Sequence, residues 1–393
     1  MVVIGLNGFN RIARNFLRTV YDDISALQKV TVAVINIGPA DPEYVAHTFK
    51  YDALLGTYPG NVKIEGNFLV INTHKIRLYA QADVTKIDWA GHEVTWVVET
   101  AGICKTQKDI KKFGASVRVL LAYPCGAAEV TYIAGSGGVE YEGQFSVSLG
   151  SCLDHAIQPL LKVVSDIAGS IIAGNVTVLY GHTNDHIFGH LRDCLDDTDT
   201  RSMQNNPLVA VQGSGVEVIE QEFGITQLQR SPALNIIPAG SYGMALPVQT
   251  VILEKQESTI KHGMQAIQIS LFSMPLERVS LVDFTLIISK NINTQDLRSK
   301  LKHAFDIQKL AGLEYCENSF VSSDVIDNPH GLIVDGTSVK VVTQSSGERI
   351  STTIKIFGWY DNQSSYSAHI KSFLLKYGVL ISSNLEVCQQ LEK

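Results

Sequence analysis

VVIGLNGFNRIA, residues 2–13, sets the architecture of the first half of the chain. A short apolar strand, a turn at Gly8 and the start of a helix follow one another directly. The helix continues to Val20 with apolar side chains on one side. Strand, glycine turn and helix in this order are typical of a dinucleotide-binding βαβ unit, which lays a pyrophosphate on the helix N-terminus.

The glycine pattern of this turn departs from Gly-x-Gly-x-x-Gly at two positions, where Asn10 and Ala13 stand. A side chain at Asn10 leaves less room for the pyrophosphate, whereas alanine is an accepted third residue. After a second strand at residues 30–35, Ile37 stands where a carboxylate normally binds the ribose. A hydrogen bond to a charged group contributes about 1.5–3 kcal/mol, so the sequence predicts weakened dinucleotide binding. Residues 37–41 hold no arginine or lysine for a 2′-phosphate.

The composition limits the class of protein. With 393 residues, 45% of them hydrophobic and 18% charged, the chain is long enough for two or three domains with sizeable cores. We find neither an apolar run of membrane-spanning length nor a signal peptide, so we expect a cytoplasmic protein. A net charge of −7 argues against a nucleic-acid partner. Six scattered cysteines without a CxxC pair indicate neither a disulfide framework nor a zinc site.

The remaining pattern predicts two different layers. Strand signals between residues 69 and 134 alternate with a helical stretch at 105–113, which favours a largely parallel α/β sheet. Strand signals between residues 176 and 357 suggest an antiparallel sheet with one covered face. Residues 366–391 read as a helix over the first domain. We therefore expect an α/β dinucleotide-binding domain and an α+β domain with a mainly antiparallel sheet.

Residues 149–155, LGSCLDH, place the thiol of Cys152 after a small-residue turn and at the head of a helix. Unpaired N–H groups at a helix N-terminus lower a thiol pKa and stabilise the thiolate. The alternative is that Cys152 is a small buried hydrophobe, and the local sequence alone favours that alternative.

With these pieces assembled, the chain resembles glyceraldehyde-3-phosphate dehydrogenase over nearly its whole length. The matching stretches occur in one order, and their number makes the resemblance specific. They are NGF at 7–9, RI at 11–12, FKYD at 49–52, SC at 151–152, TND at 183–185, NIIP at 235–238, VSLVD at 279–283, VSSD at 321–324 and WYDN at 359–362.

The resemblance implies a Rossmann-type domain from residues 1–151 with the helix at about 366–393, and a catalytic domain at 152–365. It implies a homotetramer and the glycolytic reaction, in which a cysteine thiolate attacks an aldehyde phosphate, hydride passes to the cofactor and phosphate cleaves the thioester. NAD is the cofactor implied, with NADP as an alternative and with weak or lost binding as a further prediction.

The resemblance also assigns site residues. Cys152 falls on the nucleophile. Tyr180 falls on the base histidine, and His182, two residues on, either replaces that base or fills the place of a family tyrosine; we prefer the second reading. The cofactor-binding positions are Asn7, Gly8, Phe9, Arg11, Ile12 and Asn362, and the substrate or phosphate positions are Ser151, Thr183, Arg230 and Ser241.

Several family features are missing. Ser273 stands where the family has a substrate-binding arginine, and a hydroxyl cannot replace that fork of charged donors. Asp154 would raise the thiol pKa if it faces the site. His155 and His186 are read as surface or packing residues, and no metal is expected. The acidic loop at 185–229 is longer than its family counterpart, and either a solvated loop or a protein-binding insert fits it.

Two hypotheses remain. Either the protein is a phosphorylating aldehyde dehydrogenase that uses Cys152 with His182, or it is a degenerate homologue, a pseudoenzyme, that keeps the fold. The replacements at Asn10, Ile37 and Tyr180, together with that of the substrate arginine, lie far apart in sequence but belong to one site. They favour impaired or lost activity.

Overall fold

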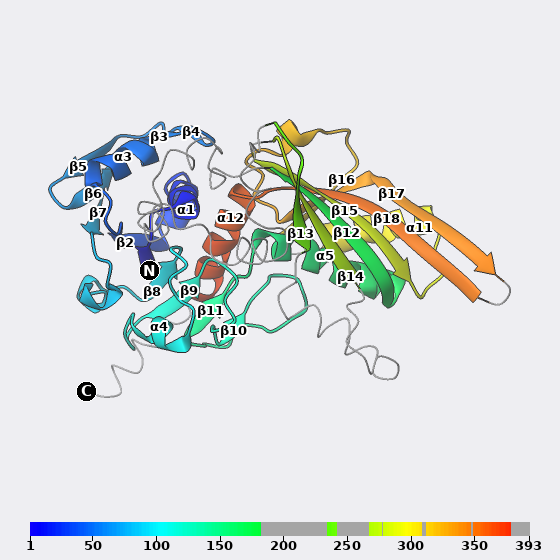
Figure 1. The fold of residues 1–393 in the computed structure, drawn as a ribbon, viewed down its shortest axis with the longest axis horizontal. Coiled ribbons are helices and arrows are strands. Elements are labelled where there is room, and N and C mark those ends of the chain that lie inside the picture. The colour runs from blue at the N-terminus through cyan, green and yellow to red at the C-terminus, as the bar shows by residue number, and fades with distance from the viewer. Residues whose placement is uncertain (182–233, 242–266, 277, 309–311, 347–348, 379–393) are drawn as a thin grey trace.

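The computed structural model describes residues 1–181, 234–241, 267–276, 278–308, 312–346 and 349–378. Their strands form two main sheets that lie side by side, with the N-terminal layer at one end of the molecule and the second sheet at the other (Figure 1). A small two-stranded sheet, β3 (Tyr51–Asp52) with β4 (Gly56–Thr57), lies beside the first layer. Among these residues, none of the helices has the length and apolar character needed to span a membrane.

The first sheet has nine strands in the order β10-β11-β9-β8-β1-β2-β7-β6-β5. Its strands pair in parallel from β10 to β7, and β6 and β5 extend it as antiparallel edge strands. The strands are β1 (Val2–Asn7), β2 (Val30–Asn36), β5 (Val62–Glu65), β6 (Phe68–Ile71), β7 (His74–Tyr79), β8 (Trp96–Glu99), β9 (Arg118–Leu121), β10 (Val130–Thr131) and β11 (Ser146–Ser148).

Among the described residues, helices α1 to α4 belong to this domain, and α12 (Ser364–Phe373) packs on it from the end of the chain. Helix α1 (Arg11–Tyr21) buries Ile12, Phe16, Leu17 and Val20, the apolar side that its sequence predicts. The others are α2 (Ile24–Leu27), α3 (Pro42–Lys50) and α4 (Gln107–Lys111), with 3₁₀ turns η1 (Val84–Lys86) and η2 (Ala90–His92).

The second sheet has seven strands in the order β13-β14-β12-β15-β18-β17-β16. Two of its six strand pairs, β12 with β14 and β16 with β17, are parallel and the rest are antiparallel. The strands are β12 (Ile171–Gly181), β13 (Ile237–Ser241), β14 (Ile267–Met274), β15 (Val279–Ile288), β16 (Leu313–Cys316), β17 (Leu332–Ser346) and β18 (Arg349–Asp361), with the 3₁₀ turn η3 (Ser322–Val325) between β16 and β17.

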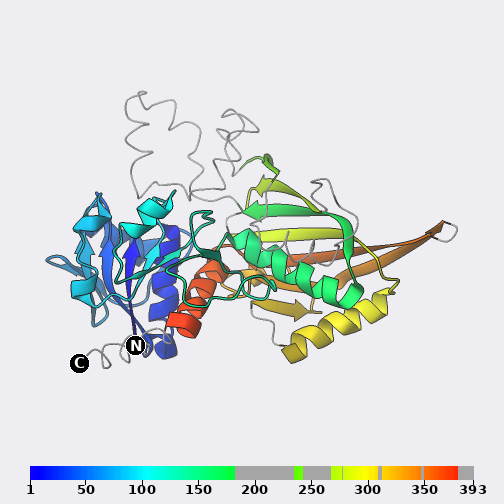
Figure 2. The same cartoon turned by 90° about the horizontal axis from the view of Figure 1, so that it is seen from below.

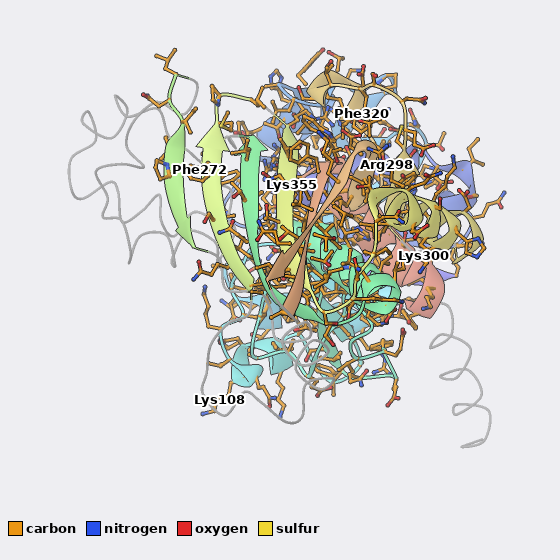
Figure 3. The ribbon with its side chains drawn as sticks, turned by 90° about the vertical axis from the view of Figure 1, so that its right-hand side faces the viewer. Lys108, Phe272, Arg298, Lys300, Phe320 and Lys355 are labelled. Atoms are coloured by element: carbon orange, nitrogen blue, oxygen red, sulfur yellow. The ribbon has the colours of Figure 1, made fainter. Side chains whose placement is uncertain are left out.

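Helices α5 (Cys152–Ala168) and α11 (Thr294–Gln308) lie on the same side of this sheet (Figure 2) and share its core. Seen end-on, the sheet carries Phe272 on β14 near one edge and Lys355 on β18 toward its middle, while Arg298 and Lys300 mark α11 (Figure 3). One covered face and one partly exposed face match the alternation of exposure along β14 and β15.

The chain returns to the first layer through α12 (Ser364–Phe373), which ends in a π turn at Leu374–Gly378 (η4). Phe373 lies edge-on to Trp96 and Tyr132 in the first domain, at centroid distances of 5.6 and 5.3 Å. Lys371 pairs with Asp23 at 2.9 Å. The helix therefore packs on the first domain as predicted, although the described part ends at Gly378 and the rest of the predicted helix lies outside the described residues. The predicted fold class is confirmed, and the domain boundaries stay predictions.

Candidate functional site

Cys152 is the first residue of α5, and its position is fixed by the turn before it. Gly150 takes a φ of +60°, a conformation that favours glycine. Ser151 caps the helix: its Oγ accepts a hydrogen bond from the backbone N–H of Asp154 at 3.2 Å, and the Asp154 carboxylate accepts one from the Ser151 N–H at 2.8 Å. This reciprocal cap explains why the helix begins at this residue.

The thiol of Cys152 is less acidic than the sequence suggests. Burial raises its pKa to about 11, although the Arg11 guanidinium lowers it. The Asp154 charge raises the pKa further, in the predicted direction, while the Leu153 N–H and the Tyr360 hydroxyl lower it. This rise in the pKa is opposite to the direction expected from the helix N-terminus and favours the alternative of a small packed side chain, because the loss of hydration outweighs the helix end. A pKa raised in this direction favours the protonated thiol at neutral pH, although the side chain is only partly buried.

Tyr180 and Ser273 are direct neighbours on the parallel strands β12 and β14. The Tyr180 side chain is half-buried, Ser273 is fully buried, and contact with the Ser273 hydroxyl opposes the rise in the Tyr180 pKa, which burial takes to about 12. The contact falls short of full hydrogen-bond geometry, since Ser273 Oγ finds no well-placed partner among the described residues. The two positions at which the resemblance puts a histidine base and an arginine thus hold two touching neutral hydroxyls.

Tyr360 on β18 lies between the Tyr180–Ser273 pair and the Cys152 thiol. Its hydroxyl contacts Cys152, and burial raises the Tyr360 pKa far above its usual value. The neighbouring Tyr180 also raises the Tyr360 pKa, and contact with the Ser280 hydroxyl lowers it. Sequence reasoning quoted Tyr360 within the WYDN stretch but gave it no role; its place directly before Asp361 and Asn362 was the available signal.

Some predicted site residues lie outside the described residues. These are His182, Thr183 and Arg230, together with His186 and the loop at 185–229. The backbone of Ser241 ends β13 and pairs with Ser270 of β14, but its side chain is also outside the described set. The roles predicted for them stay predictions.

His155 is a packing residue, as predicted. Its Nε2 lies 2.8 Å from the Leu149 carbonyl oxygen, and its ring stacks on His369 of α12 at 4.0 Å. Burial lowers the His155 pKa to about 4 and the His369 pKa well below its usual value. The two rings stay neutral and fasten α5 to α12. No cluster of potential metal ligands occurs among the residues the structure describes.

In the first sheet, Asn7 and Gly8 lie at the carboxyl end of β1. The Asn7 side chain accepts a hydrogen bond from Asn36 at 2.8 Å and donates one to Glu99. A Cβ at Gly8, whose φ is +98°, would lie 2.7 Å from Thr100 Oγ1, so this turn requires glycine. Glu99 is fully buried, and burial raises its pKa to about 7. The Asn7 side chain is engaged within the protein, and its predicted contact with the cofactor stays a prediction.

The start of α1 carries three of the predicted cofactor positions. The side chains of Phe9 and Ile12 are buried in the core, so these residues could contact a ligand only through their backbone groups. Two guanidinium nitrogens of Arg11, Nε and Nη1, are buried without a partner among the described residues. Asn10 turns inward: its Oδ1 accepts from the Ala13 N–H at 3.1 Å and its Nδ2 donates to the Thr100 carbonyl at 2.6 Å. Asn10 therefore uses a helix N–H that a pyrophosphate would otherwise meet.

Residues at two places test whether a dinucleotide fits. Asn362 is buried, and its Oδ1 has no hydrogen-bond partner among the described residues. The same is true of Nε and Nη1 of Arg11. These atoms suit a carboxamide and a phosphate. Ile37, by contrast, is an apolar side chain only 1% exposed in the core, and it offers no acceptor to a ribose hydroxyl. The residues fit the nicotinamide and pyrophosphate end better than the adenosine end.

Arg278 is a second residue that sequence reasoning missed. Its guanidinium donates to the Leu54 carbonyl of the first domain at 3.0 Å and to the Asp361 carboxylate at 2.8 Å. It also donates to Ser364 at 3.1 Å and contacts Asp327. One buried side chain therefore joins the first domain to the end of β18 and the start of α12. A lone arginine within an irregular stretch carries no sequence signal for this role.

Two family models match the chain. Residues 2–107 match the NAD binding domain of glyceraldehyde 3-phosphate dehydrogenase, and residues 214–362 match the C-terminal domain of the same enzyme. The first match supports NAD(H) as the cofactor of the first domain. Cys152 and Tyr180 lie between the two matched regions.

Curated relatives match nearly the full length. Glyceraldehyde-3-phosphate dehydrogenase 1 of Caenorhabditis elegans is 29% identical over 383 residues, covering 93% of this chain and 95% of that protein. The enzyme of Colletotrichum lindemuthianum is 27% identical over 376 residues, covering 95% and 96%. Glyceraldehyde-3-phosphate dehydrogenase 1 of Bacillus subtilis (strain 168) is 26% identical over 374 residues, covering 94% and 96%.

Proposed function

The chain belongs to the glyceraldehyde-3-phosphate dehydrogenase family, and we propose that its family activity is impaired or lost. The observation that carries this proposal is the placement of Tyr180 beside Ser273, with Tyr360 between Tyr180 and the Cys152 thiol. Neither side chain takes a proton from a thiol at neutral pH or pairs with a phosphate charge.

The Cys152 thiol itself supports the same proposal. The thiolate is the nucleophile in thiol chemistry, and a thiol whose pKa lies near 11 is almost wholly protonated at pH 7. Tyr360 contributes a hydroxyl contact but no base of suitable strength. Removing a positioned general base lowers a rate by about 10²–10⁴-fold.

The cofactor side supports weak binding of NAD. NAD, when bound, would accept hydride, and in this chain Arg11 would hold its pyrophosphate and Asn362 its carboxamide. Asn10 occupies the Ala13 N–H, and Ile37 leaves the ribose without a charged partner. A ribose carboxylate contributes about 1.5–3 kcal/mol per hydrogen bond, so its absence lowers affinity by about tenfold or more.

A second candidate is an active NAD-dependent phosphorylating aldehyde dehydrogenase with His182 as a displaced base. Cys152 supports it, because this thiol begins a helix and the Arg11 charge and the Leu153 N–H both favour its thiolate.

One assay separates the two candidates. Purified full-length protein is given glyceraldehyde 3-phosphate, inorganic phosphate and NAD, and NADH is followed by absorbance. The proposal expects no robust NAD reduction. Turnover at ordinary rates that disappears in Cys152→Ser would overturn it and favour the active enzyme. Titration of NAD and NADP by calorimetry gives an independent measure, with weak binding of either expected.

The assembly is part of the proposal. We propose a homotetramer in the cytoplasm, with the loop at 185–229 as an optional contact for a protein partner. In support of assembly, the face of the second sheet away from α5 and α11 carries half-exposed apolar side chains, among them Leu179, Phe272, Leu281 and Trp359. Sedimentation of the purified protein, with and without this loop, tests both statements.

A further inference from the structure

The site around Cys152 carries a feature that bears on the kind of molecule it accepts. Tyr180 and Ser273 face each other across β12 and β14, both next to the ends of their strands. Ser273 is only 1% exposed, so a ligand meets the half-buried Tyr180 first. The pair therefore offers a ligand an aromatic ring and a phenol hydroxyl.

This pair carries no charge at physiological pH. Burial raises the Tyr180 pKa to about 12, and a serine hydroxyl does not titrate. Among the described residues, Arg11 is a cation that acts on the Cys152 thiol, and it comes from α1 of the first domain and not from the second sheet. In the same described part of the chain, the side chains that β12 and β14 place at this pair of positions are the two hydroxyls of Tyr180 and Ser273.

A phosphate group and an uncharged group differ sharply in such surroundings. A phosphate that leaves water needs charge-assisted hydrogen bonds, and two neutral hydroxyls that touch each other give it none. An uncharged hydroxyl or carbonyl loses little hydration and can share a hydrogen bond with Tyr180. The Tyr180–Ser273 pair therefore favours an uncharged group over an anion, because it offers the anion no charged donor.

We propose that Tyr180 and Ser273 make the Cys152 site selective for an uncharged hydroxyaldehyde over the phosphate ester of the same aldehyde. The inference rests on the proposed function in one respect, namely that Cys152 is the group that meets the aldehyde. The thiol sulfur forms a bond to the carbonyl carbon as the carbonyl π bond opens, and the thiol proton ends on the former carbonyl oxygen. This addition is reversible and consumes no oxidant, reductant or cofactor.

The test compares glyceraldehyde with glyceraldehyde 3-phosphate, which differ only in the phosphate. Full-length protein without cofactor is treated with iodoacetamide at several concentrations of each aldehyde, and alkylation of the Cys152 peptide is followed by mass spectrometry. The concentration of free aldehyde that half-protects Cys152 should be about tenfold or more lower for glyceraldehyde than for the phosphate ester. This factor corresponds to the loss of one charge-assisted hydrogen bond. Equal protection, or better protection by the ester, would overturn the inference.

Two variants sharpen the test. Ser273→Arg should move the preference toward the phosphate ester by about tenfold or more. Gln268→Arg adds the same charge at an exposed position of β14 and should leave the preference unchanged. Because an arginine at the buried position 273 displaces its neighbours, Tyr180→His at the half-buried position is the second variant. Its preference should shift toward the ester at pH 5.5, where the imidazole is protonated, and return at pH 8.

The outcomes separate this inference from the proposed function. Robust NAD reduction with the phosphate ester contradicts the proposed function. Better protection by the ester without NAD reduction contradicts only the proposed selectivity. A Tyr180→His variant whose preference for the two aldehydes does not change with pH also contradicts only the selectivity.

Discussion

The strand ends of the two sheets are built differently. At the ends of β1, β2 and β8, Asn36, Asn7 and Glu99 form a hydrogen-bonded chain in which each side chain has a partner. At the ends of β12 and β14, Tyr180 touches a Ser273 hydroxyl that has no well-placed partner among the described residues. A complete buried network rigidifies a fold, whereas an incomplete one marks a place where water or a ligand completes the bonding. The strand ends of the first sheet thus carry a completed hydrogen-bond chain, and those of the second carry a hydroxyl pair whose bonding the described residues leave incomplete.

The difference also appears in charge. The first set contains an ionisable carboxyl, that of Glu99, whose pKa burial raises to about 7, so that it titrates near physiological pH. The second set contains hydroxyls that stay neutral. The two regions therefore respond differently to mutation and pH, and four predictions test this contrast.

The largest expected effect comes from Arg278, which joins the two regions. Arg278→Met leaves the fully buried Asp361 carboxylate without its cation, so the free energy of unfolding should fall by about 3–5 kcal/mol. Urea unfolding measures this. Lys162→Gln, which removes the exposed pair with Asp166, should change stability by less than about 1 kcal/mol. Equal effects of the two variants would show that Arg278 does not hold the junction.

The next effect concerns the stacked imidazoles of His155 and His369. Burial lowers the His155 pKa to about 4 from the ordinary 6.5. Between these two pH values the unfolded chain therefore binds a proton at His155 that the folded protein does not bind. This contribution is present above pH 6.5 and is lost as pH falls toward 4, by about 3 kcal/mol. Asp154, whose charge opposes the lowering, and the neutral Tyr366 ring also face this pair.

His155→Gln should therefore flatten the dependence of unfolding free energy on pH between 7 and 4. His303→Gln, at an exposed position of α11, should leave that dependence as it is. An unchanged slope in His155→Gln would mean that the stacked pair does not control acid stability.

Glu99 gives an effect of similar size and opposite sign. Burial raises its pKa to about 7 from 4.5, so its contribution to stability is full below pH 4.5 and is lost as pH rises through 7. Glu99→Gln removes this loss, and relative to the unmodified protein it should gain about 3 kcal/mol between pH 4.5 and pH 8. Glu142→Gln, exposed on the surface, is the matched control. A gain of the same size in that variant would assign the effect to net charge.

The sequence predicted the fold well because the fold follows local patterns. The apolar spacing of α1 and the Ser151–Asp154 cap mark helices by their own residues. The small-residue turn before Cys152 also predicted that this thiol lies at the head of a helix. These features depend on neighbours within four residues of one another, which a single sequence displays.

The electrostatics of the site were not predicted, because they arise from residues far apart in the chain. Cys152 is desolvated within a fold that brings Tyr360 of β18 and Arg11 of α1 against it. The same holds for the stack of His155 on His369 and for the junction at Arg278. Position in the sequence gives the type of residue at a site but not the hydration it loses on folding.

The smallest expected effect tests the cofactor turn and so the contrast itself. Asn10 caps α1 and occupies the Ala13 N–H, at the place where a pyrophosphate would lie. Asn10→Gly frees that N–H and removes the side chain, so NAD should bind about three- to tenfold more tightly, equivalent to about 1 kcal/mol. Stability should change by only a few tenths of a kcal/mol, because glycine is a tolerated cap.

Calorimetric titration with NAD and thermal unfolding of the apoprotein measure the two quantities together. Asn10→Ala is the matched control: it loses the cap, at about 1 kcal/mol of stability, and its Cβ still limits the approach of a phosphate, so its gain in affinity should be smaller. Tighter NAD binding by Asn10→Gly would show that the first domain still binds the cofactor and that the Asn10 side chain limits its affinity. Unchanged affinity would move the limit to Ile37, and the first region would then be as altered for ligand binding as the second.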